Sequence, residues 1–241
     1  YTITDNAGNS TTCSKTANVY VDKNAPTVID INKIYIQNVT INEISATYSL
    51  RINSDYSSDS DSGIFGYQFK LGDNNWQSVA ISNNNQYIYT PSSHTSAYND
   101  NICVRSIDNA GNYSSSACID VDGKKTQIAQ FYEQFLQRGG TYGEILIHNN
   151  QGDNARERAY IIGFSNESLN NYDGLTDKWD KARRIYRGFL GRYAQDWEAR
   201  KVACYISDIG VKLPMLAVIN NSNVVLSGYG SEEYTRICNK Y

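Results

Sequence analysis

The spacing of apolar residues divides the chain into a strand-rich first half and a helix-rich second half. Apolar and polar side chains alternate in residues 48–52 and 65–71, which predicts strands with one buried face. Short apolar runs separated by turn residues predict seven strands in all. They cover residues 28–36, 44–53, 64–71, 77–81, 86–89, 101–108 and 114–120.

The clearest helical pattern lies in residues 175–197. Apolar side chains from Trp179 to Leu190 recur at helical spacing, and Thr176-Asp177 is a helix-start signal. The other faces of this helix carry Lys178, Lys181, Arg183, Arg184 and Arg187. Further helices are expected over residues 127–138, 155–162, 195–209, 213–220 and 231–240. The fold class predicted from these patterns is multidomain, an all-β Ig-like sandwich followed by an all-α C-terminal helical bundle.

An internal repeat sets the expected domain borders. The sequence DNAGN occurs at residues 5–9 and 108–112, each time between a strand and a Ser/Thr-rich strand that leads to Val-Asp. The spacing of about 100 residues matches the size of an immunoglobulin-like sandwich. We therefore expect residues 1–24 to be the last hairpin of a preceding Ig-like domain, and the chain to be the C-terminal part of a longer protein. Residues 25–122 would form one sandwich, 123–126 a linker and 127–241 a helical domain of two units.

The DNAGN turn, the strand ending in Val-Asp and the Pro26-Thr27 start resemble the tandem Ig-like repeats of bacterial surface proteins. The stretch SGIFGYQFKLGDNNWQSV resembles the third-strand region of those repeats. This resemblance covers residues 1–122. It implies a stalk-like sandwich and says almost nothing about a ligand.

The helical half repeats itself and resembles a second family. The segment QFYEQFLQR matches RIYRGFLGR, and IIGFSNESLN matches VLSGYGSEEYTRI. A bacterial helical family labelled a domain of unknown function, distantly similar to phycobilisome linker domains, has repeated LYxxxLGRxxD…W and GFxxSxEF modules. The residues that fit are Tyr186, Leu190, Gly191 and Arg192, and then Gly228, Tyr229, Ser231, Glu233 and Tyr234; Asp196 comes one residue late, directly before Trp197. The resemblance covers residues 127–241 and implies an all-helical fold on secreted or surface proteins, with no known catalytic site.

Five cysteines indicate disulfides if the protein is extracellular. Cys103 and Cys118 flank the second DNAGN turn at mirrored positions, so they would face each other across a hairpin. Cys204 and Cys238 would then pair in the helical half, which leaves Cys13 for a partner before Tyr1. The alternative is five free, buried thiols.

Composition and motifs argue against several classes of function. Residues 1–123 carry 6 basic and 12 acidic side chains, and residues 124–241 carry 16 basic and 13 acidic ones. The basic excess of the second half is too small for a typical nucleic-acid-binding domain. No apolar run approaches the roughly 20 residues of a membrane helix, so no membrane insertion is expected. The two histidines, His94 and His148, are expected in surface loops, and no HExxH, GxSxG, P-loop or GxGxxG spacing occurs. We therefore expect no enzyme activity.

One candidate metal site is an acidic loop. Asp55, Asp59 and Asp61 place three carboxylates close together in the chain, and carboxylate oxygens suit calcium. The loop lacks the Gly and terminal Glu of an EF-hand, so a solvated acidic loop is the alternative. Asp22, Asp120 and Asp122 sit at expected domain junctions, where calcium could rigidify a linker. No other cofactor is expected.

The binding candidates are Arg183, Arg187, Arg192, Asp196 and Trp197. Arg192 and Asp196 could contact a ligand or lock helix ends through ion pairs, including one from Arg192 to Glu232 or Glu233. The basic side chains from Lys178 to Arg187 could meet an anionic cell-wall polymer or a sialylated glycan, or form a solvated face. The 20 tyrosines suit either an interface or strand packing.

These observations favour a secreted or surface-displayed, non-catalytic binding protein, an adhesin in which an Ig-like stalk presents the helical domain to a host glycoprotein, a glycan or another surface protein. The alternative is a module that anchors the protein to the envelope or assembles copies of it, and an uncharacterised enzyme ranks third.

Overall fold

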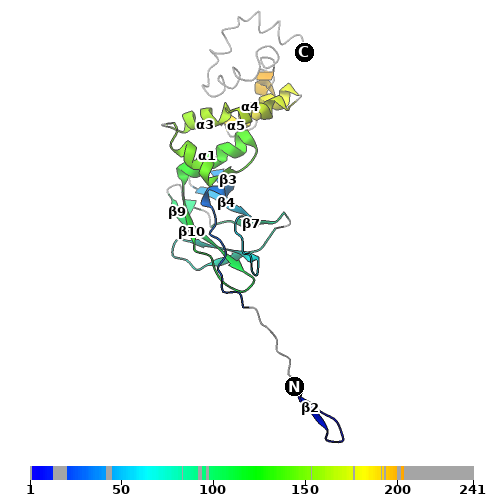
Figure 1. Ribbon diagram of the computed structural model, residues 1–241. Helices are drawn as coiled ribbons and strands as arrows, with labels where there is room; N and C mark the ends of the chain where they lie inside the picture. Colours follow the sequence, from blue (N-terminus) through cyan, green and yellow to red (C-terminus); the bar gives the residue numbers. More distant parts are fainter. Residues whose placement is uncertain are drawn as a thin grey trace, which may run out of the picture.

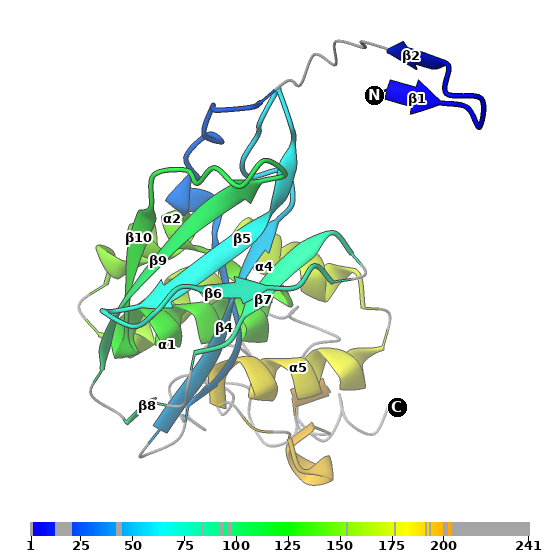
Figure 2. The same ribbon diagram turned by 90° about the horizontal axis from the view of Figure 1, so that it is seen from below.

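The structure is a computed structural model that describes residues 2–12, 21–41, 45–82, 84–91, 94–95, 98–152, 154–175, 177–190, 192, 194–199 and 202–203. Its largest part is a pair of antiparallel sheets (Figures 1 and 2). One sheet has the order β10-β9-β5-β6 and the other the order β11-β3-β4-β7, with β8 pairing on β4. The strands are β3 (Tyr35–Ile41), β4 (Ser45–Asn53), β5 (Ile64–Leu71), β6 (Gln77–Val79), β7 (Gln86–Tyr89), β8 (His94–Thr95), β9 (Asn99–Asp108), β10 (Ala117–Asp122) and β11 (Gly140–Thr141).

The two sheets pack through aromatic and branched side chains at alternate strand positions. Phe69 of β5 stacks on Tyr89 of β7 with 4.9 Å between ring centroids, and Tyr67 meets Tyr87 edge to face at 4.7 Å. Such pairs join the sheets because offset and edge-to-face ring contacts add to the apolar area buried. The alternation predicted for residues 65–71 is therefore that of the sandwich core at Tyr67 and Phe69. Phe65 is 68% exposed, because the β5–β9 register shifts beside it, between Ile64 and Gly66.

The DNAGN repeat has the same structure in both copies. At the tip of the hairpin β1 (Thr2–Thr4) and β2 (Ser10–Thr12), Asp5 Oδ1 accepts the backbone N–H groups of Ala7 and Asn9, both at 2.9 Å. Asp108 Oδ1 accepts those of Ala110 and Asn112, at 2.9 and 2.8 Å. The glycine in each turn has positive φ, 88° at Gly8 and 93° at Gly111, which explains why this position is glycine.

Helices follow the last strand of the sandwich directly. They are α1 (Gly123–Phe131), the π-helix η2 (Tyr132–Leu136) that continues it, α2 (Tyr142–Asn149), α3 (Ala155–Gly163), α4 (Asn166–Asp173) and α5 (Lys178–Leu190), and a short 3-10 turn η1 (Ile31–Lys33) precedes β3. The predicted linker, residues 123–126, is the first turn of α1, and Asp122 accepts the Lys125 N–H as its N-cap. Residues 196–199 are also helical.

The segment after α1 is bonded back onto the sandwich. The strand β11 pairs with Tyr35 and Ile36 of β3, and the Tyr142 N–H donates to the Ile34 carbonyl at 2.7 Å. Gly139 lies so close to β3 that a Cβ at this position would come 2.9 Å from Gln37 Cβ and 3.0 Å from the Ile36 carbonyl oxygen. The segment between η2 and α2 therefore extends one sheet of the sandwich.

The predicted fold class, a sandwich followed by a C-terminal helical bundle, is wrong. Most of the described elements are strands, and α1, η2, α2 and α3 share one apolar core with both sheets. Fully buried members of this core include Ile36 and Leu50 from strands and Ile128, Phe135 and Ile145 from helices. The reason is that α1 packs on β3 as well as on α2 and α3, so strands and helices bury their apolar sides in the same core. A second, smaller core joins α4 and α5 and contains Tyr172, Ala182, Ile185, Ala199 and Val202. The helices expected at residues 213–220 and 231–240, and most of 195–209, lie outside the described residues.

Several element borders also differ from the sequence-based expectations. Residues 28–36 were expected as one strand, but the Asp30 side chain accepts the Asn32 N–H and caps η1, so the strand begins only at Tyr35. Neither α2 nor α4 was expected. Both begin at side-chain caps, Thr141 with Glu144 in a capping box and Ser165 on the Ser168 N–H. These caps are visible in the sequence, and they mark both helices.

Candidate binding site

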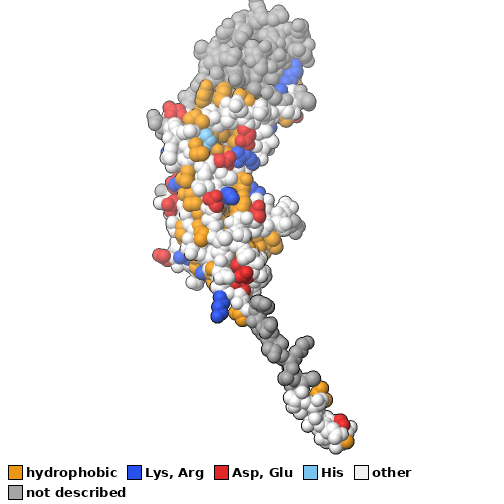
Figure 3. Space-filling model, in the orientation of Figure 1, with side chains coloured by type: hydrophobic (Ala, Val, Ile, Leu, Met, Phe, Trp, Pro, Cys, Tyr) orange, Lys and Arg blue, Asp and Glu red, His pale blue; other side chains and the backbone are white. Residues whose placement is uncertain are grey.

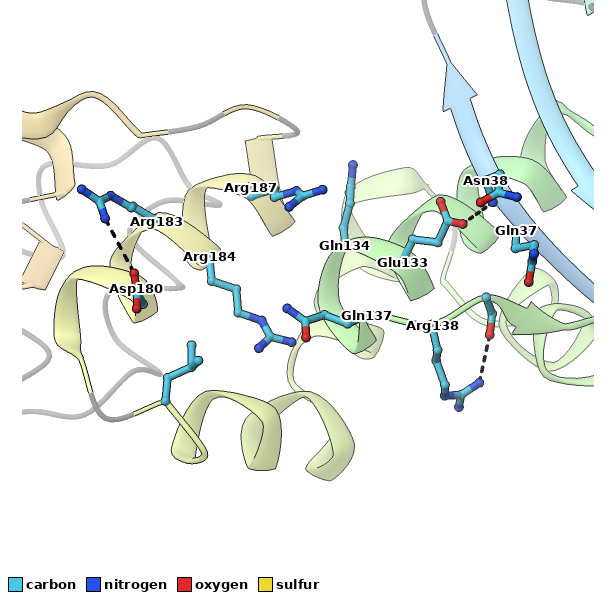
Figure 4. A pocket seen from close by; sticks show the side chains of 12 residues that line it. Gln37, Asn38, Glu133, Gln134, Gln137, Arg138, Asp180, Arg183, Arg184 and Arg187 are labelled. Carbon is cyan, nitrogen blue, oxygen red and sulfur yellow. Dashed lines mark hydrogen bonds and ion pairs between the residues drawn. The ribbon is translucent and has the colours of Figure 1, made fainter. Parts of the chain in front are cut away.

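A cavity of about 790 Å³ lies between the π-helix η2 and the edge of β3 on one side and α5 on the other (Figure 4). Its walls carry mainly guanidinium, amide and carboxylate groups. The lining residues are Gln37, Asn38, Glu133, Gln134, Gln137, Arg138, Gly139, Leu175, Asp180, Arg183, Arg184 and Arg187. The cavity therefore combines residues far apart in the sequence, and it includes Arg183 and Arg187, two of the predicted binding residues.

The first wall is formed by an irregular helix end. Residues 132–136 form a π-helix, and Gln137 directly after it has the left-handed φ of 58°. Single π-turns within α-helices are frequently found at functional sites, and left-handed non-glycine residues cost conformational energy. Here this irregular turn brings Glu133, Gln134 and Gln137 to the cavity.

Glu133 joins this wall to the sheet. The β3–β4 register shifts between Gln37 and Thr40, and the backbone N–H groups of Asn38 and Val39 in this bulge donate to the Glu133 carboxylate, the second at 3.0 Å. Burial raises the pKa of Glu133, although the two backbone hydrogen bonds act in the opposite direction. Glu133 thus satisfies donors that the bulge removes from the strand ladder.

Arg138 borders the cavity but is neutralised from outside it. Its guanidinium donates to both Glu144 oxygens at 2.9 and 2.7 Å, and its Nε donates to Glu167 at 2.7 Å. These hydrogen bonds raise the pKa of Arg138. Two carboxylates thus surround one guanidinium, and Arg138 brings no uncompensated positive charge to the cavity.

Arg184 differs from Arg138 because its partners are neutral. It is 9% exposed, and its two Nη groups donate to the backbone carbonyls of Asn171 and Phe135, both at 3.3 Å. The Gln137 amide oxygen, turned toward Arg184, accepts from the same groups at 3.2 and 3.3 Å, and Figure 4 shows the two side chains meeting between the walls. Among the described residues no carboxylate pairs with Arg184, and its Nε is buried without a partner. Desolvation accordingly lowers its pKa.

The second wall is the amphipathic helix predicted from the sequence. Helix α5 begins after Asp177, whose side chain accepts the Trp179 N–H at 2.9 Å, and it buries Ala182 and Ile185 against α4. This orientation places Arg183, Arg184 and Arg187 on the cavity side. Arg183 and Asp180, both exposed, lie 3.6 Å apart.

Arg192, another predicted binding residue, belongs to a second copy of the Arg138 arrangement. Arg192 donates to both oxygens of Glu198 at 2.7 and 2.6 Å and lies 5.3 Å from the Tyr186 ring, as Arg138 lies 5.1 Å from the Tyr132 ring. The Gln195 N–H donates to Glu198 as the Thr141 N–H donates to Glu144, so each contact recurs 54 positions later. Arg192 thus pairs with Glu198, which the sequence interpretation missed although the six-residue spacing is present in both copies.

Asp196 and Trp197 lie on the surface beside this ion pair. Trp197 is 65% exposed, and its Nε1 donates to the Gln195 side chain at 2.6 Å. In the first copy, Arg138 also binds Glu167. The corresponding partners predicted for Arg192, Glu232 and Glu233, lie outside the described residues.

One residue of the acidic loop, Asp59, belongs to a cluster of carboxylates outside the cavity. Carboxylate oxygens of Asp22, Asp59 and Asp108 lie within 4.8 Å of one another, whereas Asp55 and Asp61 do not belong to this group. Asp22 Oδ2 is buried without a hydrogen-bond partner, and a set of carboxylates suits a hard cation such as calcium. Asp108 is also the first residue of the DNAGN turn. Calcium binding here stays a prediction, now with Asp22 and Asp108 in place of Asp55 and Asp61.

The predicted disulfide between Cys103 and Cys118 is confirmed, with the two residues directly opposite on β9 and β10. Cys13, Cys204 and Cys238 lie outside the described residues. His94 lies in β8 and His148 in α2, so neither is in the loop expected for it. Burial lowers the pKa of His148, and the centroid of its ring lies 5.7 Å from that of Tyr132.

On the face drawn in Figure 3, acidic and basic side chains are scattered among uncharged ones. In the part of the chain that the structure describes, no helix is long and apolar enough to cross a membrane. Comparisons with protein-family models, with curated proteins and with solved structures found no match to this chain.

Proposed function

We propose that the chain belongs to a non-catalytic binding protein, secreted or displayed on a cell surface, and that the cavity between η2 and α5 is its recognition site. The observation that supports this most directly is Arg184, a buried cation at the wall of a polar cavity whose partners among the described residues are all neutral. Burying a charge without a counter-charge is costly, and proteins accept this cost mainly where the charge has a function.

The groups around the cavity favour binding over catalysis. Among the residues that the structure describes, the lining includes no Ser, Cys or His side chain, the usual nucleophiles and bases. Its two carboxylates have structural partners, Glu133 at the strand bulge and Asp180 beside Arg183. The amides and guanidinium groups that remain are suited to hydrogen bonding with a polar ligand.

Envelope anchoring through a basic face has less support. Of the five cations expected to form that face, Arg184 is buried and Arg183 lies next to an acidic residue. The cavity therefore accounts for the arginines of α5 better than a flat basic surface does.

The test is binding of the labelled full chain to a glycan array and to intact mammalian cells. The variant Arg187→Glu should abolish binding, whereas Lys181→Glu, which changes the charge of the same helix outside the cavity lining, should not. Equal loss in both variants, or none in either, would place recognition elsewhere. Absence of binding by the unmodified chain on every surface would refute the proposal.

A further inference from the structure

Resting on the proposed function, we infer that the cavity takes an acidic sugar and that the arginines of α5 hold its anionic group. The first reason is the charge that the walls leave uncompensated. Of the four arginines among the described lining residues, Arg138 is neutralised by Glu144 and Glu167, and Arg183 lies beside Asp180. The positive charge of Arg184 has no such partner among the described residues.

The second reason is that Arg184 is held in place. The carbonyls of Phe135 and Asn171 fix its guanidinium from two sides, and Gln137 fixes it from the cavity wall. A charge that is fixed and desolvated attracts an anion more strongly than one on a mobile surface side chain, because no ordering is needed when the ligand arrives. Arg187 lies one turn further along α5, at the spacing that places it next to both Arg183 and Arg184.

The third reason concerns the rest of the ligand. Facing α5 are the amide side chains of Gln134 and Gln137, with Asn38 from the strand (Figure 4). Amides donate and accept hydrogen bonds and therefore match hydroxyl groups. The volume of about 790 Å³ is in the range of small-molecule sites and exceeds the need of an inorganic anion. A polyhydroxylated ligand with one carboxylate satisfies both walls.

The experiment is calorimetric titration of the full chain with four probes, namely sialic acid, glucuronic acid, galactose and inorganic sulfate. At least one acidic sugar should bind, more weakly as salt is raised, and at least tenfold more tightly than galactose or sulfate. Arg187→Gln should weaken its binding tenfold or more, while Lys181→Gln leaves it unchanged. Arg184→Met should abolish it; because this variant removes contacts to two backbone carbonyls, it is interpreted only if its circular dichroism and melting match those of the unmodified chain.

The outcomes separate this inference from the proposed function. Sulfate binding as tightly as the acidic sugars would overturn the sugar assignment. Binding of neutral glycans or of cells that is indifferent to Arg187 would overturn the charge assignment and place recognition at another site. A chain that binds none of the probes but binds cells through Arg187 would refute the acidic sugar and leave the proposed function standing.

Discussion

Replacing Phe135 by alanine should destabilise the strands of the sandwich as well as the helix that carries it. Phe135 is fully buried in the core that joins η2 to both sheets, and its carbonyl also anchors Arg184. Removing a buried phenylalanine ring costs about 3–5 kcal/mol, through lost apolar burial and the cavity left behind. This is a large share of the roughly 5–15 kcal/mol that typically stabilises a domain.

Hydrogen exchange measured by mass spectrometry distinguishes the elements. Protection of the slowest amides in β4, β5 and β9 should fall by the same free energy as in α1, because amides opened only by global unfolding report the stability of the whole unit. Ile147→Ala is the matched control, since that side chain is 58% exposed and its loss should change stability by about 0.5 kcal/mol or less. Loss of protection in α1 with unchanged strands would refute the continuous core.

Three further predictions test single features of the structure. Gly139→Ala should lower the free energy of unfolding in urea by about 1–3 kcal/mol, because the added Cβ would overlap β3. Gly174→Ala, whose Cβ would make only ordinary contacts beyond 3.6 Å, should be close to neutral. Equal effects of the two substitutions would contradict the close approach of Gly139 to β3. Reducing the Cys103–Cys118 bond, which closes a loop of 15 residues, should cost about 3 kcal/mol and lower the melting temperature, and an unchanged melt with dithiothreitol would be the opposite result. Burial would raise the pKa of Glu144, but hydrogen bonds from Arg138 and Thr141 outweigh this and hold the pKa below 4.5. The stability from the Arg138–Glu144 pair should therefore be present above that pH and be lost as pH falls through the folded-state pKa. The variant Glu144→Gln should accordingly weaken the acid dependence of the urea midpoint.

The sandwich strands could be predicted because each carries its own local signal. The strands β5 and β7 begin and end at the residues expected, since alternation and turn residues mark them directly. The cysteine pair was also predictable, because mirrored positions around a hairpin turn fix its register.

The packing of the helices could not be predicted in the same way. The apolar face of residues 127–138 is equally compatible with a partner helix and with a sheet, and periodicity does not distinguish the two. The decisive feature is the double glycine after that helix. Gly139 allows the close approach to β3, and Gly140 pairs with Ile36 while leaving room for the side chains of Tyr132 and Ile145 from the helices.

The candidate site was predicted in part. Arg183 and Arg187 were singled out from the basic pattern of their helix, and both line the cavity. Arg184 was expected on the exposed face, because spacing alone does not reveal that Phe135 and Asn171 offer it backbone carbonyls. Glu133 and Gln137 carry no signal of their own, since the π-turn that directs them to the cavity depends on tertiary contacts.

The most direct test of the account is a crystal structure of the full chain with a bound acidic sugar. We expect the carboxylate of the sugar to lie within hydrogen-bonding distance of the guanidinium groups of α5, and its hydroxyls on Gln134 and Gln137. A sugar bound outside this cavity, or one seated in it with its carboxylate directed away from Arg184 and Arg187, would contradict the account.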